Sequence, residues 1–271
     1  MNQVQTNVVF NHAYKFYRSD NKILIERGGS RSGKTFNILL WIIFDYCFQN
    51  QNHIITICRK TFPSLRGTVM RDFLDILKNY ELYSEKDHNK SNSEYYLNNN
   101  TIEFISLDQP AKIRGRKRNL LFVNECNEID WDSWQQLIFR TEGQIILDYN
   151  PSESNHWIYD KVETRDDAVF YKTTYKDNPF IDKNIIHELE RLKETDDEYW
   201  QVFGLGERAL SRTQIFSFST INKIPEDAKF LSIGMDFGYT NDPTCAVEVY
   251  QKDHNLYINE LLYRTMMTTA D

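Results

Sequence analysis

The chain has 271 residues, a net charge of −7 and 41% hydrophobic residues, which suits one large or two modest globular domains and excludes wholesale disorder. An acidic chain of this kind does not coat nucleic acid indiscriminately, although a local basic patch can still contact DNA. The longest apolar stretch, residues 38–44, is shorter than the about 20 residues of a membrane span, so we expect no membrane partner. The four cysteines have no paired spacing, which argues against a zinc ribbon or a disulfide framework.

Strands and helices are predicted to alternate along most of the chain. Apolar and β-branched runs predict buried strands, and an apolar period near 3.6 residues predicts helices. The predicted strands cover residues 22–27, 54–58, 119–123, 144–147 and 169–173, and a hairpin joins 95–97 to 101–106. The predicted helices cover residues 35–48, 72–80, 131–139 and 182–199. This alternation predicts right-handed βαβ crossovers and an α/β fold with a mostly parallel central sheet flanked by helices.

A break in this pattern falls between residues 209 and 229. This segment is largely polar and contains one proline, so we expect a linker there. New strands are predicted over residues 230–235 and 246–250, with no closing element after them. We therefore expect a first domain over residues 1–208 and the incomplete beginning of a second domain over residues 230–271.

A glycine-rich loop with the spacing G-x-x-x-x-G-K-[ST] lies between the first predicted strand and the first predicted helix. Its glycines let successive backbone N–H groups turn toward phosphate oxygens, and the helix N-terminus adds the positive end of its dipole. The lysine is suited to the β- and γ-phosphates and the threonine hydroxyl to Mg²⁺, so the loop predicts binding of ATP with Mg²⁺. The loop residues are Gly28, Gly29, Ser30, Arg31, Ser32, Gly33, Lys34 and Thr35.

Such a loop needs an acidic residue at the end of a neighbouring strand. The strand over residues 119–123 is followed by Asn124 and Glu125, where the usual order is Asp and then Glu. We expect Asn124 to face the metal and to reach it through a bound water without contributing charge. Glu125 is expected to orient and deprotonate an attacking water. The alternative, that both are ordinary polar residues at a strand end, stays open.

Six segments, in this order, resemble the large terminase subunit of tailed bacteriophages, the ATPase motor that packages DNA into preformed heads. The segments are 28–35 (GGSRSGKT), 59–66 (RKTFPSLR), 124–130 (NECNEID), 147–152 (LDYNPS), 174–180 (TYKDNPF) and 204–207 (GLGE). The resemblance implies a P-loop NTPase domain in which Arg31 takes part in catalysis. It also implies that Asn150 relays the state of the γ-phosphate to the part that grips DNA.

The same resemblance implies an RNase H-like nuclease after the motor domain. Residues 234–238 (GMDFG) resemble its first strand, and Asp236 would be the first ligand of a site for two Mg²⁺ or Mn²⁺ ions. Since the other carboxylates would lie further along, we expect endonuclease activity in the full-length protein and not in this chain. The alternative is that Asp236 ends an ordinary strand.

Five cations stand within residues 112–118. They could contact DNA phosphates, which would make binding strongly salt-dependent, or form a solvated surface. The resemblance implies a third use, in which Arg114 is an arginine finger that completes the ATP site of a neighbouring subunit in a homo-oligomeric ring.

The chain is therefore identified as a member of this family and as a DNA-translocating ATPase. The resemblance implies double-stranded DNA, a portal protein and a small terminase subunit as partners, in the host cytoplasm and transiently at the procapsid portal. Two other functions stay open. One is another DNA-directed P-loop motor such as a helicase, and the other is a nucleotide-binding assembly protein with negligible turnover, which the neutral Asn124 keeps open.

Overall fold

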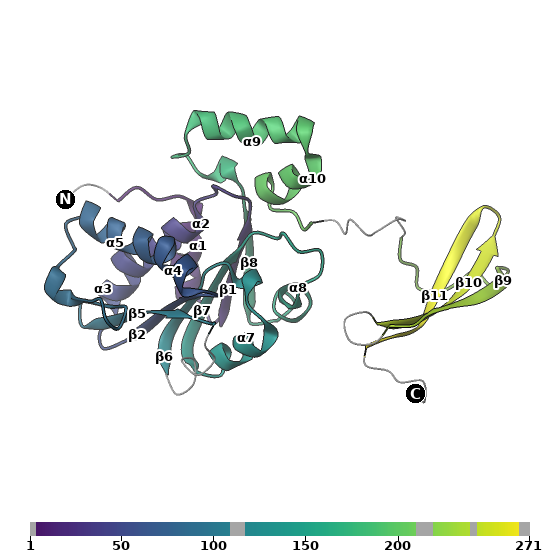
Figure 1. The fold of residues 1–271 in the computed structure, drawn as a ribbon, viewed down its shortest axis with the longest axis horizontal. Coiled ribbons are helices and arrows are strands. Elements are labelled where there is room, and N and C mark those ends of the chain that lie inside the picture. Colours follow the sequence, from purple (N-terminus) through teal and green to yellow (C-terminus); the bar gives the residue numbers. More distant parts are fainter. Residues whose placement is uncertain (1–3, 109–116, 210–218, 239–242, 266–271) are drawn as a thin grey trace. The chain divides into compact units, whose positions relative to one another are not determined.

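The computed structural model describes residues 4–108, 117–209, 219–238 and 243–265. The chain divides into two compact units, Met1–Thr213 and Gln214–Asp271, and each contains its own sheet (Figure 1). The division falls within the segment 209–229 that the sequence analysis predicts as a linker.

The first unit contains an eight-stranded sheet in the order β3-β4-β5-β2-β6-β7-β1-β8. All pairs from β5 to β8 are parallel, and the short strands β3 and β4 are antiparallel at one edge. The strands are β1 (Ile23–Gly28), β2 (Ile54–Arg59), β3 (His88–Asn89), β4 (Glu94–Leu97), β5 (Asn100–Ser106), β6 (Arg118–Val123), β7 (Thr141–Tyr149) and β8 (Ala168–Thr173). The predicted α/β fold with a mostly parallel sheet is confirmed.

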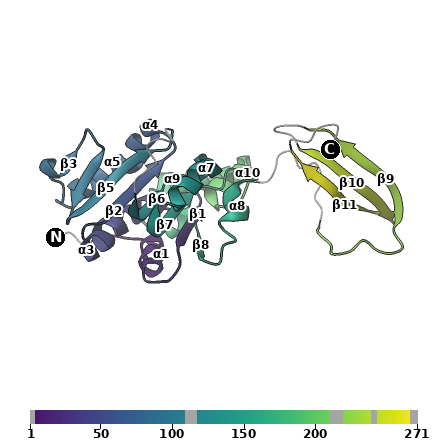
Figure 2. The same ribbon diagram turned by 90° about the horizontal axis from the view of Figure 1, so that it is seen from below.

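Helices cover both faces of this sheet (Figures 1 and 2). Alternate residues of β1 enter two separate cores, because successive side chains of a strand point to opposite faces. Leu24 packs with α1, α2 and α5, whereas Ile23 and Ile25 pack with α7 and α8. The helices are α1 (Val8–Tyr17), α2 (Lys34–Trp41) with a π-helical turn (Ile42–Tyr46) and α3 (Cys47–Gln49), α4 (Phe62–Gly67), α5 (Val69–Asn79), α7 (Trp131–Ile138), α8 (Trp157–Lys161), α9 (Lys183–Thr195) and α10 (Asp197–Tyr199). Among the described residues, none of the helices combines the length and apolar character that a membrane crossing requires.

The helix predicted over residues 182–199 is interrupted near its end, so that part of the prediction is wrong. Asp196 leaves the helical conformation, with φ −154° and ψ 81°, and its side chain accepts a hydrogen bond from the backbone N–H of Tyr199 at 3.1 Å. A short side chain that caps a new turn competes with continuation of the helix. A π-helical turn, Trp200–Gly204, then leads to Gly206, whose φ is +68°.

The second unit is a three-stranded antiparallel sheet in the order β11-β10-β9 (Figure 2). Its strands are β9 (Lys229–Asp236), β10 (Thr244–Lys252) and β11 (Asn255–Arg264). The third strand, β11, was not predicted from the sequence. A tight turn with Asp253 at φ +53° reverses the chain, so that β11 pairs with β10.

Candidate active site

The glycine-rich loop joins the end of β1 at Gly28 to the start of α2 at Lys34. Gly33 has φ +79°, a conformation in which a side chain is strained. A Cβ on Gly28 would lie 2.2 Å from the carbonyl oxygen of Thr173, so β8 leaves no room for a side chain there. Both glycines are therefore required by the path of the backbone.

A segment far along the chain packs directly against this loop. The backbone N–H of Ser30 donates to the carbonyl of Phe203 at 2.6 Å. A Cβ on Gly206 would lie 2.7 Å from Cα of Gly28 and 2.8 Å from the backbone nitrogen of Gly29. Residues 204–207, which the resemblance alone links to the nucleotide site, contact the loop in the structure.

The Lys34 ammonium is buried and held by oxygen atoms. Its Nζ donates to the carbonyls of Gly28 and Gly29 at 3.1 and 2.9 Å, to Ser32 Oγ at 3.2 Å and to Asn150 Oδ1 at 3.0 Å. Burial lowers the pKa of Lys34, while nearby carboxylates, Asp148 first, oppose that shift. Asn150, which follows β7 directly, is therefore brought to the loop as its predicted role requires.

A carboxylate that the sequence analysis did not single out lies beside Thr35. The Thr35 hydroxyl donates to Asp148 Oδ2 at 2.5 Å, and the Asn124 amide Nδ2 donates to both oxygens of Asp148, at 2.9 and 3.2 Å. The Asn124 Nδ2 also lies 3.1 Å from Thr35 Oγ1. Hydroxyl and carboxylate oxygens are ligands that Mg²⁺ prefers, so Thr35 and Asp148 fit the ion that accompanies a nucleotide.

The position of Asp148 follows from the sheet order. β7 lies between β6 and β1, and Asp148 is paired in register with Glu26, near the end of β1. The carboxyl ends of neighbouring parallel strands meet at one edge of the sheet. Asp148, which directly follows the predicted strand 144–147, could therefore have been recognised from the sequence as a candidate for this site.

Glu125 lies in the turn after β6, in the left-handed conformation with φ 50° and ψ 56°. Its backbone N–H donates to Asp148 Oδ1 at 2.8 Å. Burial, together with the nearby Asp148, raises the pKa of the Glu125 carboxyl to about 7, against the opposing influence of Lys34 and Arg59. A carboxyl that titrates near neutral pH is suited to accept a proton from water.

Three other site residues were predicted, namely Arg31, Asp236 and Arg114. Arg31 is exposed in the loop, at φ 63°, and its carbonyl accepts a hydrogen bond from Asn178 Nδ2 at 2.8 Å. Asp236 lies at the end of β9 in the second unit, exposed to solvent. Arg114 lies outside the described residues.

The predicted basic segment 112–118 is described only at its last two residues. Arg118 is 1% exposed, at the start of β6, and Lys117 forms an ion pair with Glu142 at 2.8 Å. The sheet covers Arg118, so this residue is not available for the DNA contact that the sequence leaves open for the segment.

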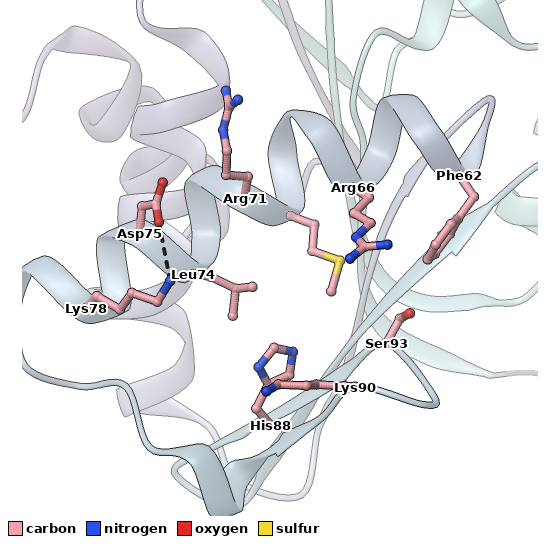
Figure 3. Close-up of a pocket in the computed structure, with 10 residues that line it drawn as sticks. Phe62, Arg66, Arg71, Leu74, Asp75, Lys78, His88, Lys90 and Ser93 are labelled. Carbon is pink, nitrogen blue, oxygen red and sulfur yellow. Dashed lines mark ion pairs between the residues drawn. The ribbon is translucent and has the colours of Figure 1, made fainter.

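A separate hollow of about 520 Å³ is bordered by α4, α5 and the β3–β4 edge (Figure 3). Four cationic side chains line it, Arg66, Arg71, Lys78 and Lys90. Three of them form ion pairs with carboxylates, Arg71–Asp72, Lys78–Asp75 and Lys90–Glu85, so its net charge is smaller than the number of cations suggests. None of its lining residues belongs to the loop or to the strand ends beside it, and we assign it no part in nucleotide chemistry.

Comparison with known proteins places this geometry in context. A family model described as phage terminase large subunit matches residues 20–207. The PBSX phage terminase large subunit of Bacillus subtilis (strain 168) is 22% identical over 279 residues. That alignment covers 89% of this chain and 64% of the relative, so the chain spans less than two thirds of that protein.

Solved structures give the same fold. The large terminase from a thermophilic bacteriophage has a TM-score of 0.63 at 18% identity, covering 95% of this chain and 69% of that one. The complex of that large terminase with ADP has a TM-score of 0.62 at 18% identity, covering 94% and 69%. The HK97 bacteriophage large terminase has a TM-score of 0.55 at 14% identity, covering 94% and 63%. With the family model matching most of the sequence, the chain belongs to the phage terminase large-subunit family, and the predicted resemblance is confirmed.

Proposed function

We propose that this member of the terminase family hydrolyses ATP at the loop over residues 28–35 and uses the energy to move double-stranded DNA into a procapsid. The observation that carries the proposal is the convergence of Lys34, Thr35 and Glu125 with Asn150 at one end of the sheet. A phosphate-binding lysine, a hydroxyl for the metal and a carboxyl base are the parts that hydrolysis of a nucleoside triphosphate requires. The bound metal ion would offset the charge of the phosphates.

Lys34 changes partners in this proposal. Its Nζ is held by four neutral acceptors. Phosphate oxygens are stronger acceptors for an ammonium than an amide oxygen, so a bound nucleotide draws Lys34 away from Asn150. The side chain of Asn150 is then released when a phosphate is present.

A hydrogen bond connects the segment of Asn150 with the end of the described part of the first unit. The carbonyl of Pro151, the next residue, accepts a hydrogen bond from the backbone N–H of Ala209 at 3.0 Å. Ala209 is the last described residue before the gap at residues 210–218. This connection supports Asn150 as the relay between the nucleotide and the following part of the chain.

Glu125 is the proposed general base. Its raised pKa keeps the carboxyl basic enough to accept a proton from water near neutral pH. Its backbone is held by Asp148, so the side chain leaves the strand end in one defined direction.

Steady-state release of phosphate from ATP by this chain tests the proposal. We expect hydrolysis that stops when Mg²⁺ is chelated, and Lys34→Ala should abolish nucleotide binding. An intact chain that binds neither ATP nor ADP in calorimetry would overturn the proposal. A nucleotide-dependent duplex unwinding without a procapsid would favour a helicase, and binding without turnover would favour an assembly protein.

The arrangement in a ring is a further part of the proposal. Arg114 would complete the ATP site of the next subunit, since head-to-tail contacts place one subunit's loop at its neighbour's site. Inactive Lys34→Ala chains should then restore hydrolysis to Arg114→Ala chains when the two are mixed. Mixed rings without any restored activity would rule out this role of Arg114.

The second unit is proposed as the first part of an RNase H-like nuclease, with Asp236 as a metal ligand. Among the described residues no group of three His, Cys, Asp or Glu side chains is suited to hold a metal ion. We expect no cleavage of plasmid DNA by this chain in Mg²⁺ or Mn²⁺. Cleavage that survives Asp236→Ala would overturn the role of Asp236. The portal protein and the small terminase subunit remain proposed partners by family membership, and their binding is tested by co-sedimentation.

A further inference from the structure

On the metal side of the candidate site, the neutral Asn124 follows β6 and the carboxylate Asp148 stands near the end of the neighbouring strand β7. At the end of β6, where the usual pattern has an aspartate, this chain has the neutral Asn124. At the end of the neighbouring strand β7 it has Asp148, which is 1% exposed and lies 2.5 Å from the Thr35 hydroxyl. A P-loop threonine paired with a carboxylate is the arrangement that holds the magnesium of a bound nucleotide.

We propose that Asp148 on β7 supplies the carboxylate that holds the nucleotide's Mg²⁺ together with Thr35, and that Asn124 on β6 positions that carboxylate. This inference rests on the proposed nucleotide binding and names the residues that serve it. The sequence-based expectation has Asn124 reach the metal through a bound water without contributing charge, and the inference adds a carboxylate that the sequence analysis did not single out.

The hydrogen bonds around Asp148 support this division of roles. Its two oxygens accept from the Asn124 amide, the Glu125 backbone N–H and the Thr35 hydroxyl. Burial raises the pKa of Asp148, and these three donors act against that shift because they stabilise the charged form of the carboxylate. The carboxylate therefore has a fixed orientation before any metal binds.

Asn124 is suited to its partner in a way that aspartate is not. Its Nδ2 faces the carboxylate, and an aspartate in that place would put two negative charges about 3 Å apart in a buried site, which disfavours ionisation of one of them. The remaining amide oxygen, Asn124 Oδ1, is buried and has no hydrogen-bond partner among the described residues. A metal-bound water is a donor that would satisfy this oxygen.

A structural role is the competing explanation for Asp148. By accepting the backbone N–H of Glu125, it also stabilises the left-handed turn at that residue. A residue with only this role would affect folding but would not alter the dependence of nucleotide binding on Mg²⁺. The two explanations therefore differ in a measurable quantity, the ratio of ADP affinities with and without the ion.

Calorimetric titration with ADP, in Mg²⁺ and in a chelator, measures this ratio. For the unaltered chain we expect Mg²⁺ to tighten ADP binding by about tenfold, a typical coupling between two ligands. In Asp148→Asn the ratio should fall below about twofold, while binding of metal-free ADP persists because Lys34 and the loop are unchanged. In the double variant Asn124→Asp/Asp148→Asn, which restores one carboxylate to the cluster, the ratio should return.

A spectroscopic measurement makes the test independent of affinity. Mn²⁺ in place of Mg²⁺ can be counted by electron paramagnetic resonance as the ion bound in the presence of ADP. We expect bound Mn²⁺ in the unaltered chain and in the double variant, and its loss in Asp148→Asn. If Asp148→Asn does not fold, the double variant still tests the inference, because its single carboxylate is then on β6.

The outcomes separate the two proposals. An unaltered chain that binds no ADP in either condition would contradict the proposed function itself. ADP binding with a Mg²⁺ effect that survives in Asp148→Asn would overturn this inference and leave the proposed function standing. A double variant that folds and binds ADP but shows no Mg²⁺ effect would also overturn it.

Discussion

Replacement of Glu125 should stabilise the first unit while it stops hydrolysis. The carboxyl has an ordinary pKa of 4.5 and a raised pKa of about 7 in the folded chain, because it is buried beside Asp148. A difference of this size corresponds to about 3 kcal/mol against folding once the carboxyl is ionised in both states. Glu125→Gln removes that charge and keeps the shape of the side chain.

The pH dependence has a defined sign. Because the folded-state pKa lies above the unfolded one, the destabilisation is absent below pH 4.5, grows as the pH rises and is complete above pH 7. The gain from Glu125→Gln should therefore be largest at pH 8 and fall to about 1 kcal/mol at pH 5. At pH 8 we expect a rise in melting temperature of roughly 5–10 °C for a unit of this size.

A second substitution tests the backbone at the same position. The left-handed conformation of Glu125 is strained by about 1 kcal/mol for a residue with a side chain, and glycine removes that strain. The greater flexibility of glycine in the unfolded chain offsets part of the gain, so we expect Glu125→Gly to melt at or slightly above Glu125→Gln.

Tryptophan fluorescence in a chelating buffer without nucleotide measures these effects. All five tryptophans precede residue 214, so the signal reports the first unit. Glu142→Gln, which alters an exposed carboxylate paired with Lys117, is the control and should shift melting by less than about 2 °C at either pH. Hydrolysis by Glu125→Gln should fall by about 10²–10⁴-fold, with ADP affinity nearly unchanged.

Two results would refute this reasoning. A Glu125→Gln chain that melts below the unaltered chain at pH 8 would show that the carboxylate stabilises the fold. A stability difference that is the same at pH 5 and pH 8 would show that the raised pKa is not its cause.

Three further predictions concern the surroundings of the loop. Gly206→Ala should weaken ADP binding at least about tenfold, because its Cβ would lie 2.7 Å from Gly28 Cα at a residue with a positive φ. The control Gly67→Ala, whose Cβ would meet no other side chain or segment within 4 Å, should leave the affinity unchanged, and equal affinities of the two variants in titration would contradict the contact between Gly206 and the loop. Asn150→Ala should keep ADP affinity within about fivefold, because three other acceptors hold Lys34. If Asn150 is the proposed relay, this variant should hydrolyse ATP without packaging DNA, and loss of both activities together would argue against that role. A chain ending at residue 213 should bind ADP within about twofold of the 271-residue chain and melt at the same temperature, since both hydrophobic cores and the site lie in the first unit. A lower melting temperature of the shorter chain would show that the second unit stabilises the first.

The parallel strands of the first unit could be predicted from sequence because a parallel sheet covered on both faces leaves little ambiguity. β1, β2, β6, β7 and β8 each contain a run of apolar or β-branched residues, whereas β5 was predicted from a hairpin signal and the two-residue strand β3 was not predicted. The interruption at Asp196 could not be predicted in this way, since charged residues continue from α9 into α10. Which structure forms there depends on a capping bond between Asp196 and Tyr199.

Only the part of the site that lies in one continuous segment could be predicted from the sequence. The phosphate loop is recognisable because its residues, 28–35, follow one another in the chain with a characteristic spacing. The position of Asp148 beside Thr35 depends on the lateral order of β6, β7 and β1 in the sheet. This order cannot be read from any short segment of the sequence. A pattern that expects an acid at the end of β6 therefore indicates a missing carboxylate, although a carboxylate is present near the end of the neighbouring strand β7.

The presence of Asp148 on β7 also changes the interpretation of the neutral Asn124 after β6. An asparagine at a place where aspartate is usual suggests a weakened metal site as long as the strand is considered alone. Beside Asp148, the same asparagine donates to the carboxylate through the group that an aspartate lacks. One negative charge next to Thr35 is thus kept, and a second aspartate added at position 124 would introduce repulsion in a buried site. Asn124→Asp alone is therefore expected to lower the melting temperature of the metal-free chain, whereas the same change combined with Asp148→Asn is not; equal melting of the two variants would contradict the pairing of these residues.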